Sequence, residues 1–343
     1  PIHYNPGILM SHVTLTRRRL LAGAAGSAGL ALAPPVVGAV EPQGRYPQRP
    51  ITLIVPYPAG GSGDYIGRTV ADKLAQRWNQ PVVVQNRPGA GGTIGVAAVS
   101  RSAADGYTIV LTTASVTLTL AQQDKPSLDL FTDIEPVSLV AVAPMVLVAH
   151  KDFPAQSVKD LIALTRQAPG RYFYGGTGQG GVGNLAIELV KLKLGLDLTY
   201  VPYQGGAASI AAVVANQIPL AINDVGNILP FVKAGTLKPL LVASPERFSL
   251  LPDAVGLSEL GVSDLDIKAS LGLAAPKGTP AAITAALARE VGEIMKLPDV
   301  QARFHQAGLQ PVGSTPQAYA EFLKAENRQF RQGVQATGLS QGA

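Results

Sequence analysis

The sequence VPYPAGGSGDYIGR, residues 55–68, follows an apolar run at residues 51–55 and leads into a predicted helix that begins near Asp64. Two prolines and three glycines separate the run from this helix. Glycine permits backbone conformations and close approaches that a side chain forbids. The start of a helix leaves N–H groups unpaired and partly positive. The stretch therefore predicts a strand, a glycine loop and a helix start that together form a seat for an anion; a tight turn without a ligand is the alternative.

A second stretch of the same form, YGGTGQGGVGNLAIELVKL, spans residues 174–192. It again predicts a strand, a glycine loop and an amphipathic helix. If the two units belong to separate lobes, both helix N-termini can point toward one shared cleft. Neither loop core, residues 56–63 or 175–183, contains Arg or Lys. An anion there would be held by backbone N–H groups, hydroxyls, water and helix ends.

Short apolar, β-branched runs alternate with helical periodicity along most of the chain, which predicts a parallel α/β fold. Strands are predicted at residues 51–55, 81–85, 107–111, 136–149, 171–174, 198–201, 220–223 and 238–243, with a short strand after residue 270. Helices are predicted at residues 64–78, 93–101, 158–167, 184–194, 207–216, 225–233, 280–296, 299–307 and 316–333. A chain of 343 residues exceeds one typical domain, so two lobes are expected.

The composition narrows the class of protein. Hydrophobic residues make up 47% of the chain and charged residues 15%, a balance typical of a compact α/β protein and not of a disordered one. The formal net charge is +5, and Arg17, Arg18 and Arg19 supply three of these charges. No basic stripe interleaved with aromatics occurs, so nucleic acid is not an expected partner. The absence of cysteine excludes disulfides, thiolate metal sites and iron–sulfur clusters.

The first 39 residues have the form of an export leader. They contain no acid, and TRRRLL at residues 16–21 opens an uncharged stretch that runs to residue 40. Its arginines resemble a twin-arginine export signal, and residues 37–39 match the small-residue pattern of a signal-peptidase site. We predict a leader over residues 1–39 with Met10 as its start, and a periplasmic protein. A membrane anchor is the alternative, because the uncharged stretch approaches the length of a membrane span.

Catalytic and cofactor sites have little support. The loop at residues 176–181 matches the dinucleotide fingerprint G-x-G-x-x-G, but Asp197 precedes the next strand instead of ending it. Both loops lack the lysine of a P-loop. His150 and His305, the only histidines after the leader, have no nucleophile and orienting group that the sequence places beside them. No acid or histidine pair has metal-ligand spacing. We therefore predict no catalytic residue, no metal and no cofactor.

Two acidic positions have more than one interpretation. Asp64 opens a predicted helix directly after the glycine loop, and is interpreted as an N-cap that also shapes the loop. Asn223 and Asp224 end a strand, where the carboxyl ends of parallel strands gather ligands. A helix cap before residues 225–233 explains them equally well.

Seven motifs in order make the chain, from about Tyr46 to near its end, resemble the Bug proteins, the extracytoplasmic solute receptors of tripartite tricarboxylate transporters. They are PYPAGGSGD (56–64), PVVVQNRPGAGGTIG (81–95), DGYT (105–108), YGGTGQGG (174–181), VPYQGG (201–206), KAGTLKPL (233–240) and APKGTP (275–280). The resemblance implies a two-lobed periplasmic binding fold of type II, a Venus flytrap in which each lobe is a mainly parallel sheet flanked by helices. Residues 46–149 and 270–343 would form the first lobe, and residues 150–269 an inserted second lobe.

In this family a ligand carboxylate lies between the two glycine loops, held by backbone amides and bridging water, and the lobes close over it. The resemblance implies these binding residues in the present chain: Tyr57, Ala59, Gly60, Gly61, Ser62, Asp64, Gly176, Thr177, Gly178, Gly181, Gly183, Asn184, Tyr203, Gln204, Gly205, Ala207 and Asn223.

The chain departs from the family pattern at a few of these places. Gly183 and Asn184 stand where Ser-His is common, and Pro219 and Asn223 stand where Asp is common. These changes alter the polarity at the distal side of the pocket, so a citrate-like ligand is not assumed.

The predicted function is that of a non-enzymatic, monomeric receptor. It would capture a small carboxylate by lobe closure and deliver it to the permease subunits of a tripartite transporter. An exported enzyme and a ligand-sensing subunit of a signalling partner are the alternatives.

Overall fold

The computed structural model describes residues 46–59, 62–178, 180–203 and 205–339. The predicted leader lies outside the described residues, as do Gly60, Gly61 and Gln204 among the predicted binding residues. The described residues belong to one compact unit. Within them, no helix combines the length and the apolar character that a membrane span requires.

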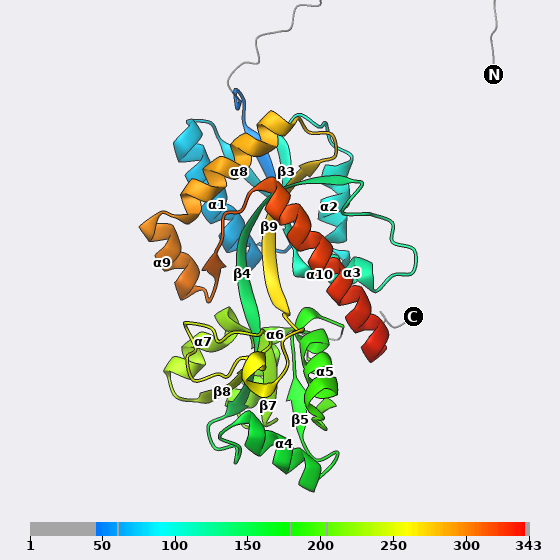
Figure 1. Ribbon diagram of the computed structural model, residues 1–343. Coiled ribbons are helices and arrows are strands. Elements are labelled where there is room, and N and C mark those ends of the chain that lie inside the picture. The colour runs from blue at the N-terminus through cyan, green and yellow to red at the C-terminus, as the bar shows by residue number, and fades with distance from the viewer. Residues whose placement is uncertain (1–45, 60–61, 179, 204, 340–343) are drawn as a thin grey trace, which may run out of the picture. The chain divides into compact units, whose positions relative to one another are not determined.

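The strands of the described chain join in one sheet with the order β2-β1-β3-β9-β4-β7-β5-β6, while β8 and β10 pair with β4 outside this path. They are β1 (Ile51–Val55), β2 (Val82–Asn86), β3 (Thr108–Thr113), β4 (Ile134–His150), β5 (Phe173–Gly175), β6 (Thr199–Tyr200), β7 (Leu220–Asp224), β8 (Leu237–Val242), β9 (Lys268–Pro276) and β10 (Gln310–Pro311). Figure 1 shows β4 and β9, the two longest strands, side by side.

Helices alternate with these strands, which confirms the predicted α/β class (Figure 1). They are α1 (Ser62–Trp78), α2 (Thr93–Ser100), α3 (Ala114–Ala121), α4 (Val158–Gln167), α5 (Val182–Leu194), α6 (Gly206–Val214), α7 (Val225–Lys233), α8 (Ala281–Met295), α9 (Pro298–Gln306) and α10 (Pro316–Thr337). The sequence does not predict α3, because its β-branched Val116, Thr117 and Thr119 favour a strand. Tertiary packing overrides this preference, since all three side chains are buried.

The strand directions are mixed. β1 runs parallel to β2 and β3, and β5 runs parallel to β6 and β7, as the sequence predicts. β9 runs antiparallel to β3 and β4, and β4 runs antiparallel to β7 and β8. The parallel ladders therefore form two groups of three strands, and the long antiparallel strands β4 and β9 join them.

β4 changes its partners along its length. Residues 134–144 pair with β9, whereas residues 145–150 pair with β7 and β8. The buried residues of β4 accordingly belong to different apolar clusters: Val140 packs with β1, β3 and α8, and Leu147 with α5 and β7. The change of partner lies close to the boundary near residues 149–150 that the sequence predicts between two lobes, and the division into lobes stays a prediction.

Candidate functional site

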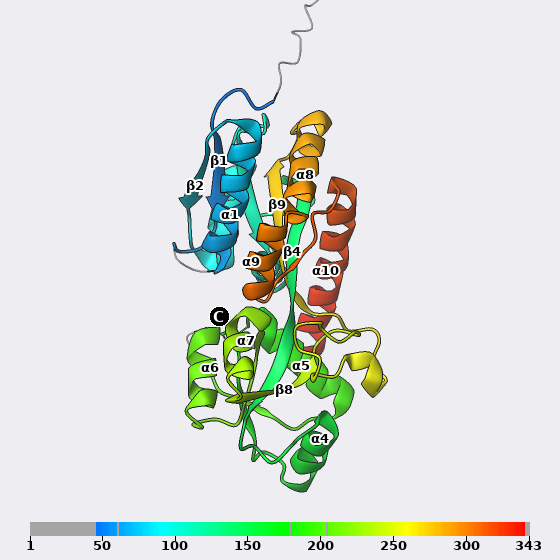
Figure 2. The same ribbon diagram turned by 90° about the vertical axis from the view of Figure 1, so that its left-hand side faces the viewer.

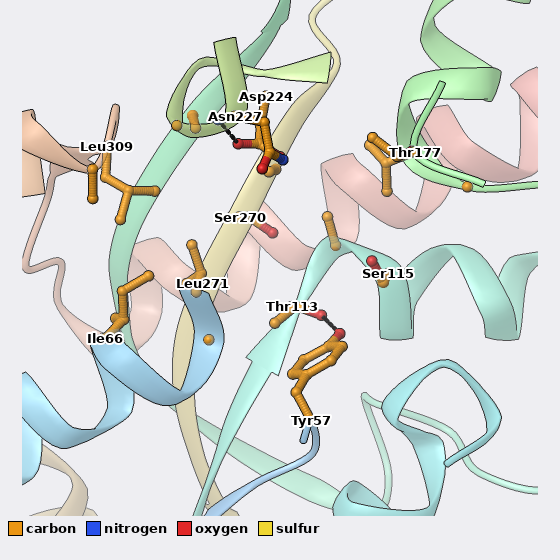
Figure 3. A pocket seen from close by; sticks show the side chains of 18 of the residues that line it. Tyr57, Ile66, Thr113, Ser115, Thr177, Asp224, Asn227, Ser270, Leu271 and Leu309 are labelled. Carbon is orange, nitrogen blue, oxygen red and sulfur yellow. Dashed lines mark hydrogen bonds between the residues drawn. The ribbon is translucent and has the colours of Figure 1, made fainter. Parts of the chain in front are cut away.

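A cavity of about 730 Å³ lies where four helices begin (Figure 3). Gly63 of α1, Ser115 of α3, Val182 of α5 and Gly226 of α7 all line it. α3 and α7 follow β3 and β7 without an intervening loop, so each begins at the carboxyl end of a strand. The carboxyl ends of strands are where open α/β sheets bind ligands.

The residues at the N-cap positions of α3 and α5 do not cap their helices with a side chain. Thr113 and Gly181 occupy the two N-cap positions, and neither makes a side-chain hydrogen bond to its helix. Neither helix has an acid in its first turn. Apart from the N–H of Gly183 in α5, which bonds to the Thr177 hydroxyl, the first N–H groups and the positive ends of the two dipoles therefore remain available at the cavity wall, where an anion would be stabilised.

The N-terminus of α7 is different, because Asp224 caps it. The carboxylate of Asp224 accepts a hydrogen bond of 3.2 Å from the backbone N–H of Asn227, and another of 2.8 Å from the side-chain amide of Asn227. Burial raises the pKa of Asp224, and the bonds from Asn227 oppose this rise. Asp224 also lines the cavity. The cap interpretation of Asp224 is thus confirmed, and the same carboxylate stands at the candidate site.

The first glycine loop is anchored by an asparagine and an aspartate. The side-chain amide of Asn86 donates to the carbonyl of Tyr57 at 3.0 Å and to the carboxylate of Asp64 at 2.9 Å. Asp64 also accepts from Arg68 at 3.0 Å. Because α1 begins at Ser62, Asp64 lies in the first turn and not ahead of the helix. Through its bond to Asn86 at the end of β2, Asp64 holds the first glycine loop in place.

Tyr57 places its ring at the cavity and its hydroxyl against the hydroxyl of Thr113 (Figure 3). Burial raises the pKa of Tyr57, while hydrogen bonds with Thr113 and Ser115 oppose the rise. Tyr57 therefore stays a neutral phenol near pH 7, and the three hydroxyls form a polar patch beside the start of α3.

The second glycine loop is held by its own side chains. Thr177 accepts a hydrogen bond from the backbone N–H of Gly183 at 3.1 Å. Asn184 accepts from the N–H of Gly180 at 3.2 Å and donates to the Tyr174 hydroxyl at 2.8 Å. Thr177 lines the cavity, whereas Asn184 is buried and fixes the loop from behind.

Asn223 ties two helix starts together. Its amide donates to the carbonyl of Gly206 and to the hydroxyl of Ser209, both at 3.2 Å, and its oxygen accepts from Asn227 at 3.0 Å. The side chain is fully buried. Asn223 therefore positions α6 against α7 and, through Asn227, supports the cap of α7.

The structure brings only part of the predicted binding set to the cavity wall. Tyr57, Thr177 and Gly181 line it. The described members that do not line it are Ala59, Asp64, Gly176, Gly178, Gly183, Asn184, Tyr203, Gly205, Ala207 and Asn223. Ser62 begins α1. Which of these residues contacts a ligand stays a prediction.

Several wall residues are absent from the predicted set. Thr113 is the last residue of β3, and Ser115 lies in the first turn of α3. The sequence could have indicated them through the end of the predicted strand at residues 107–111, because ligands bind at the carboxyl ends of strands. Asn227 and Ser270 lie in no glycine loop. The sequence gives no local sign that β9 carries Ser270 to this place, because β9 reaches it through pairing with β3 and β4.

Two contacts join distant segments beside the cavity. The side chain of Gln122, just after α3, donates to the carbonyl of Gly180 at 2.8 Å. At the other side, the start of α7 packs on the end of α9 (Figure 2). A Cβ on Gly226 would lie 2.5 Å from the Ala307 carbonyl oxygen, so only glycine permits this approach.

The described part of the cavity wall carries one charged side chain. Asp224 is the sole charged side chain among the described residues that line the cavity, and no Lys or Arg is among them. Within the described part of the chain, no three acids or histidines gather as metal ligands.

Comparison with known proteins identifies the family. The family model described as the tripartite tricarboxylate transporter family receptor matches residues 66–339. BugT of Bordetella pertussis is 34% identical over 295 residues, covering 85% of this chain and 90% of BugT. An R. palustris protein solved with adipate is 30% identical with a TM-score of 0.75, covering 86% of this chain and 99% of that protein. MatC of Rhodopseudomonas palustris, solved with bound malate, is 27% identical with a TM-score of 0.70, covering 84% of this chain and 100% of MatC.

The chain therefore belongs to the receptor family of tripartite tricarboxylate transporters. The resemblance to Bug proteins and the periplasmic-binding-protein fold are confirmed. The family consists of solute-binding receptors, so the prediction of a binding protein instead of an enzyme is confirmed as well.

Proposed function

We propose, from this family membership, that the protein captures a small carboxylate in the cavity and delivers it to the permease subunits of a tripartite transporter. The observation that carries the proposal is the meeting of two helix N-termini, those of α3 and α5, whose N-cap residues make no side-chain hydrogen bond to the helix, at one wall that lacks Lys and Arg among its described residues. Helix ends and backbone N–H groups bind anions without a cationic side chain. The adipate and malate found in the R. palustris proteins are carboxylates, which supports this ligand class.

The wall is able to supply the affinity that a receptor needs. Hydrogen bonds to a charged group contribute about 1.5–3 kcal/mol each, and micromolar binding requires about 8 kcal/mol. Several N–H groups, the hydroxyls of Ser115 and Thr177, and apolar contact with Met145, Leu271 or Leu309 would together exceed this value after entropic costs.

Capture would proceed by closure of two lobes, residues 46–149 with 270–343 and residues 150–269. The bond from Gln122 to Gly180 and the contact between Gly226 and Ala307 each join a segment of one proposed lobe to a segment of the other. A ligand that contacts both glycine loops would favour the closed form, and the permease would recognise that form.

The proposed location is the periplasm, and the proposed active form is a monomer. The leader pattern at residues 1–39, with Arg17, Arg18 and Arg19 ahead of an uncharged stretch, supports export. The twin-arginine route stays a prediction of the sequence.

A ligand panel on the purified full-length protein tests the proposal. The protein is first unfolded in denaturant, dialysed to remove any bound ligand, and refolded. It is then mixed with mono-, di- and tricarboxylates and with aromatic acids, and its thermal unfolding is followed by calorimetry. A ligand at a hundredfold excess over its dissociation constant should stabilise the fold by about 2.7 kcal/mol. The uncharged amides of the same acids are the control and should not stabilise. Unfolding curves that no acid shifts would contradict the proposal.

A further inference from the structure

The polar groups of the cavity differ from one side to the other. Helix N–H groups and hydroxyls gather near Ser115 and Thr177, at the starts of α3 and α5. In Figure 3, Asp224, Asn227 and Ser270 lie to the left of these two residues, and all three line the cavity. The hydrogen bonds of these three side chains determine what they can offer to a ligand.

Ser270 presents only lone pairs to the cavity as long as its hydroxyl donates to Glu326. Its hydroxyl donates its single hydrogen to Glu326 at 2.6 Å. A serine hydroxyl has one donor and two acceptor sites. While the bond to Glu326 is made, a ligand meets Ser270 as a hydrogen-bond acceptor.

Asn227 is also left as an acceptor. Both hydrogens of its side-chain amide are used, one in the bond to Asn223 at 3.0 Å and one in the bond to Asp224 at 2.8 Å. The amide oxygen retains its lone pairs, and Asn227 lines the cavity.

Asp224 adds a negative charge to this group. Its two oxygens accept from the backbone N–H and the side-chain amide of Asn227. An ionised carboxylate has about four acceptor sites, so it can accept further bonds from a ligand. Burial raises the pKa of Asp224 by disfavouring its charge, and a donor or cation at this place would stabilise the charged form.

We propose that the ligand carries, besides its carboxylate, a second group that donates hydrogen bonds, an ammonium or a hydroxyl, and that this group binds to Asp224, Asn227 and Ser270. The inference rests on the proposed function and makes it more specific. The preferred ligands are amino or hydroxy acids, and simple dicarboxylates are disfavoured because their second carboxylate would face three acceptors, one of them negatively charged. An ammonium gains most, because it pairs with the Asp224 charge.

Matched acids test the inference by calorimetric titration of the full-length protein. At each chain length from three to six carbons, the set comprises the unsubstituted acid, the ω-hydroxy acid, the ω-amino acid and the dicarboxylate. The ω-amino or ω-hydroxy acid of the best chain length should bind at least about tenfold more tightly than the dicarboxylate of that length. A dicarboxylate that binds as tightly or more tightly overturns the inference.

The variant Asp224→Asn removes the charge and keeps a residue that caps helices well. It should lower the preference for the ω-amino acid over the dicarboxylate at least about tenfold. Asp124→Asn, an equal change of charge at an exposed position outside the cavity wall, is the matched control and should leave the preference unchanged.

The outcomes separate the inference from the proposed function. A preference that Asp224→Asn does not change overturns the inference and leaves a carboxylate receptor in place. Failure of every acid at every chain length to bind overturns the proposed function itself. If Asp224→Asn does not fold, the ranking of acids by the unaltered protein decides the inference.

Discussion

The hydroxyl of Ser270, in the wall of the cavity, donates a hydrogen bond of 2.6 Å to Glu326, a buried carboxyl on α10. Burial raises the pKa of Glu326 to about 7, although the hydrogen bond from Ser270 opposes the rise. A group that titrates near neutral pH therefore supports the cavity from behind. The link makes the stability of the fold depend on pH.

The variant Glu326→Gln should remove part of this dependence. The folded pKa of about 7 lies above the ordinary value of 4.5, so between these values the folded state keeps a proton that the unfolded state has lost. The free energy of unfolding of the unaltered protein should therefore fall as pH rises from 4.5 to about 7, with a contribution of up to about 1.4 kcal/mol per pH unit. Urea unfolding at several pH values should show a flatter profile for Glu326→Gln.

Glu321→Gln is the matched control for this measurement. Glu321 lies on the same helix but is exposed and paired with Lys324. Its variant should keep the slope of the unaltered protein. If Glu326→Gln also keeps that slope, the raised pKa of Glu326 is refuted.

Gly181→Ala should weaken ligand binding. A Cβ at Gly181 would lie 2.8 Å from the Thr177 hydroxyl and 3.2 Å from the Gly178 carbonyl, so the second glycine loop must shift. We expect an affinity loss of about tenfold or more, which is about 1.4 kcal/mol, measured by titration with the best acid of the panel. Gly261→Ala is the control, because Gly261 has φ of +79° but no atom within 4 Å of an added Cβ. It should cost stability and leave affinity unchanged; equal affinities for both variants would argue against a role for this loop.

Gln122→Ala should lower affinity by weakening the closed form. The variant removes the bond of 2.8 Å from Gln122 to Gly180. A single hydrogen bond contributes about 0.5–1.5 kcal/mol, so the dissociation constant should rise by about threefold to tenfold. The neighbouring variant Gln123→Ala should have no such effect. Identical dissociation constants for the two variants would show that this bond does not contribute to closure.

Asn86→Ala should destabilise the first glycine loop. The change removes the hydrogen bonds that Asn86 donates to the Tyr57 carbonyl and to the Asp64 carboxylate. The Asp64 carboxylate then accepts one hydrogen bond fewer. We expect a loss of about 1–3 kcal/mol in the free energy of unfolding, together with weaker ligand binding. Gln85→Ala, at the exposed neighbouring position of β2, should change the free energy of unfolding by no more than about 0.5 kcal/mol. A loss of the same size in both variants would refute the anchoring role of Asn86.

Elements with a clear period were predictable because their pattern is local. The strand at Ile51–Val55 and the helix at Val158–Gln167 have the predicted bounds. α3 was not predictable, because its β-branched residues resemble a strand and only burial against its neighbours makes them helical. The antiparallel directions of β4 and β9 likewise depend on which strands meet in space.

The sequence by itself determined the two glycine loops, the helices that follow them and the motif order that indicates the family. These features depend on backbone geometry and amphipathic periodicity, which neighbouring residues specify. Only the tertiary structure decided which groups face the cavity. Asp224, Asn227 and Ser270 come from β7, α7 and β9, and they lie at one wall because long-range strand pairing brings these elements together. Their acceptor character depends on hydrogen bonds to Asn223 and Glu326, which no local pattern in the sequence specifies.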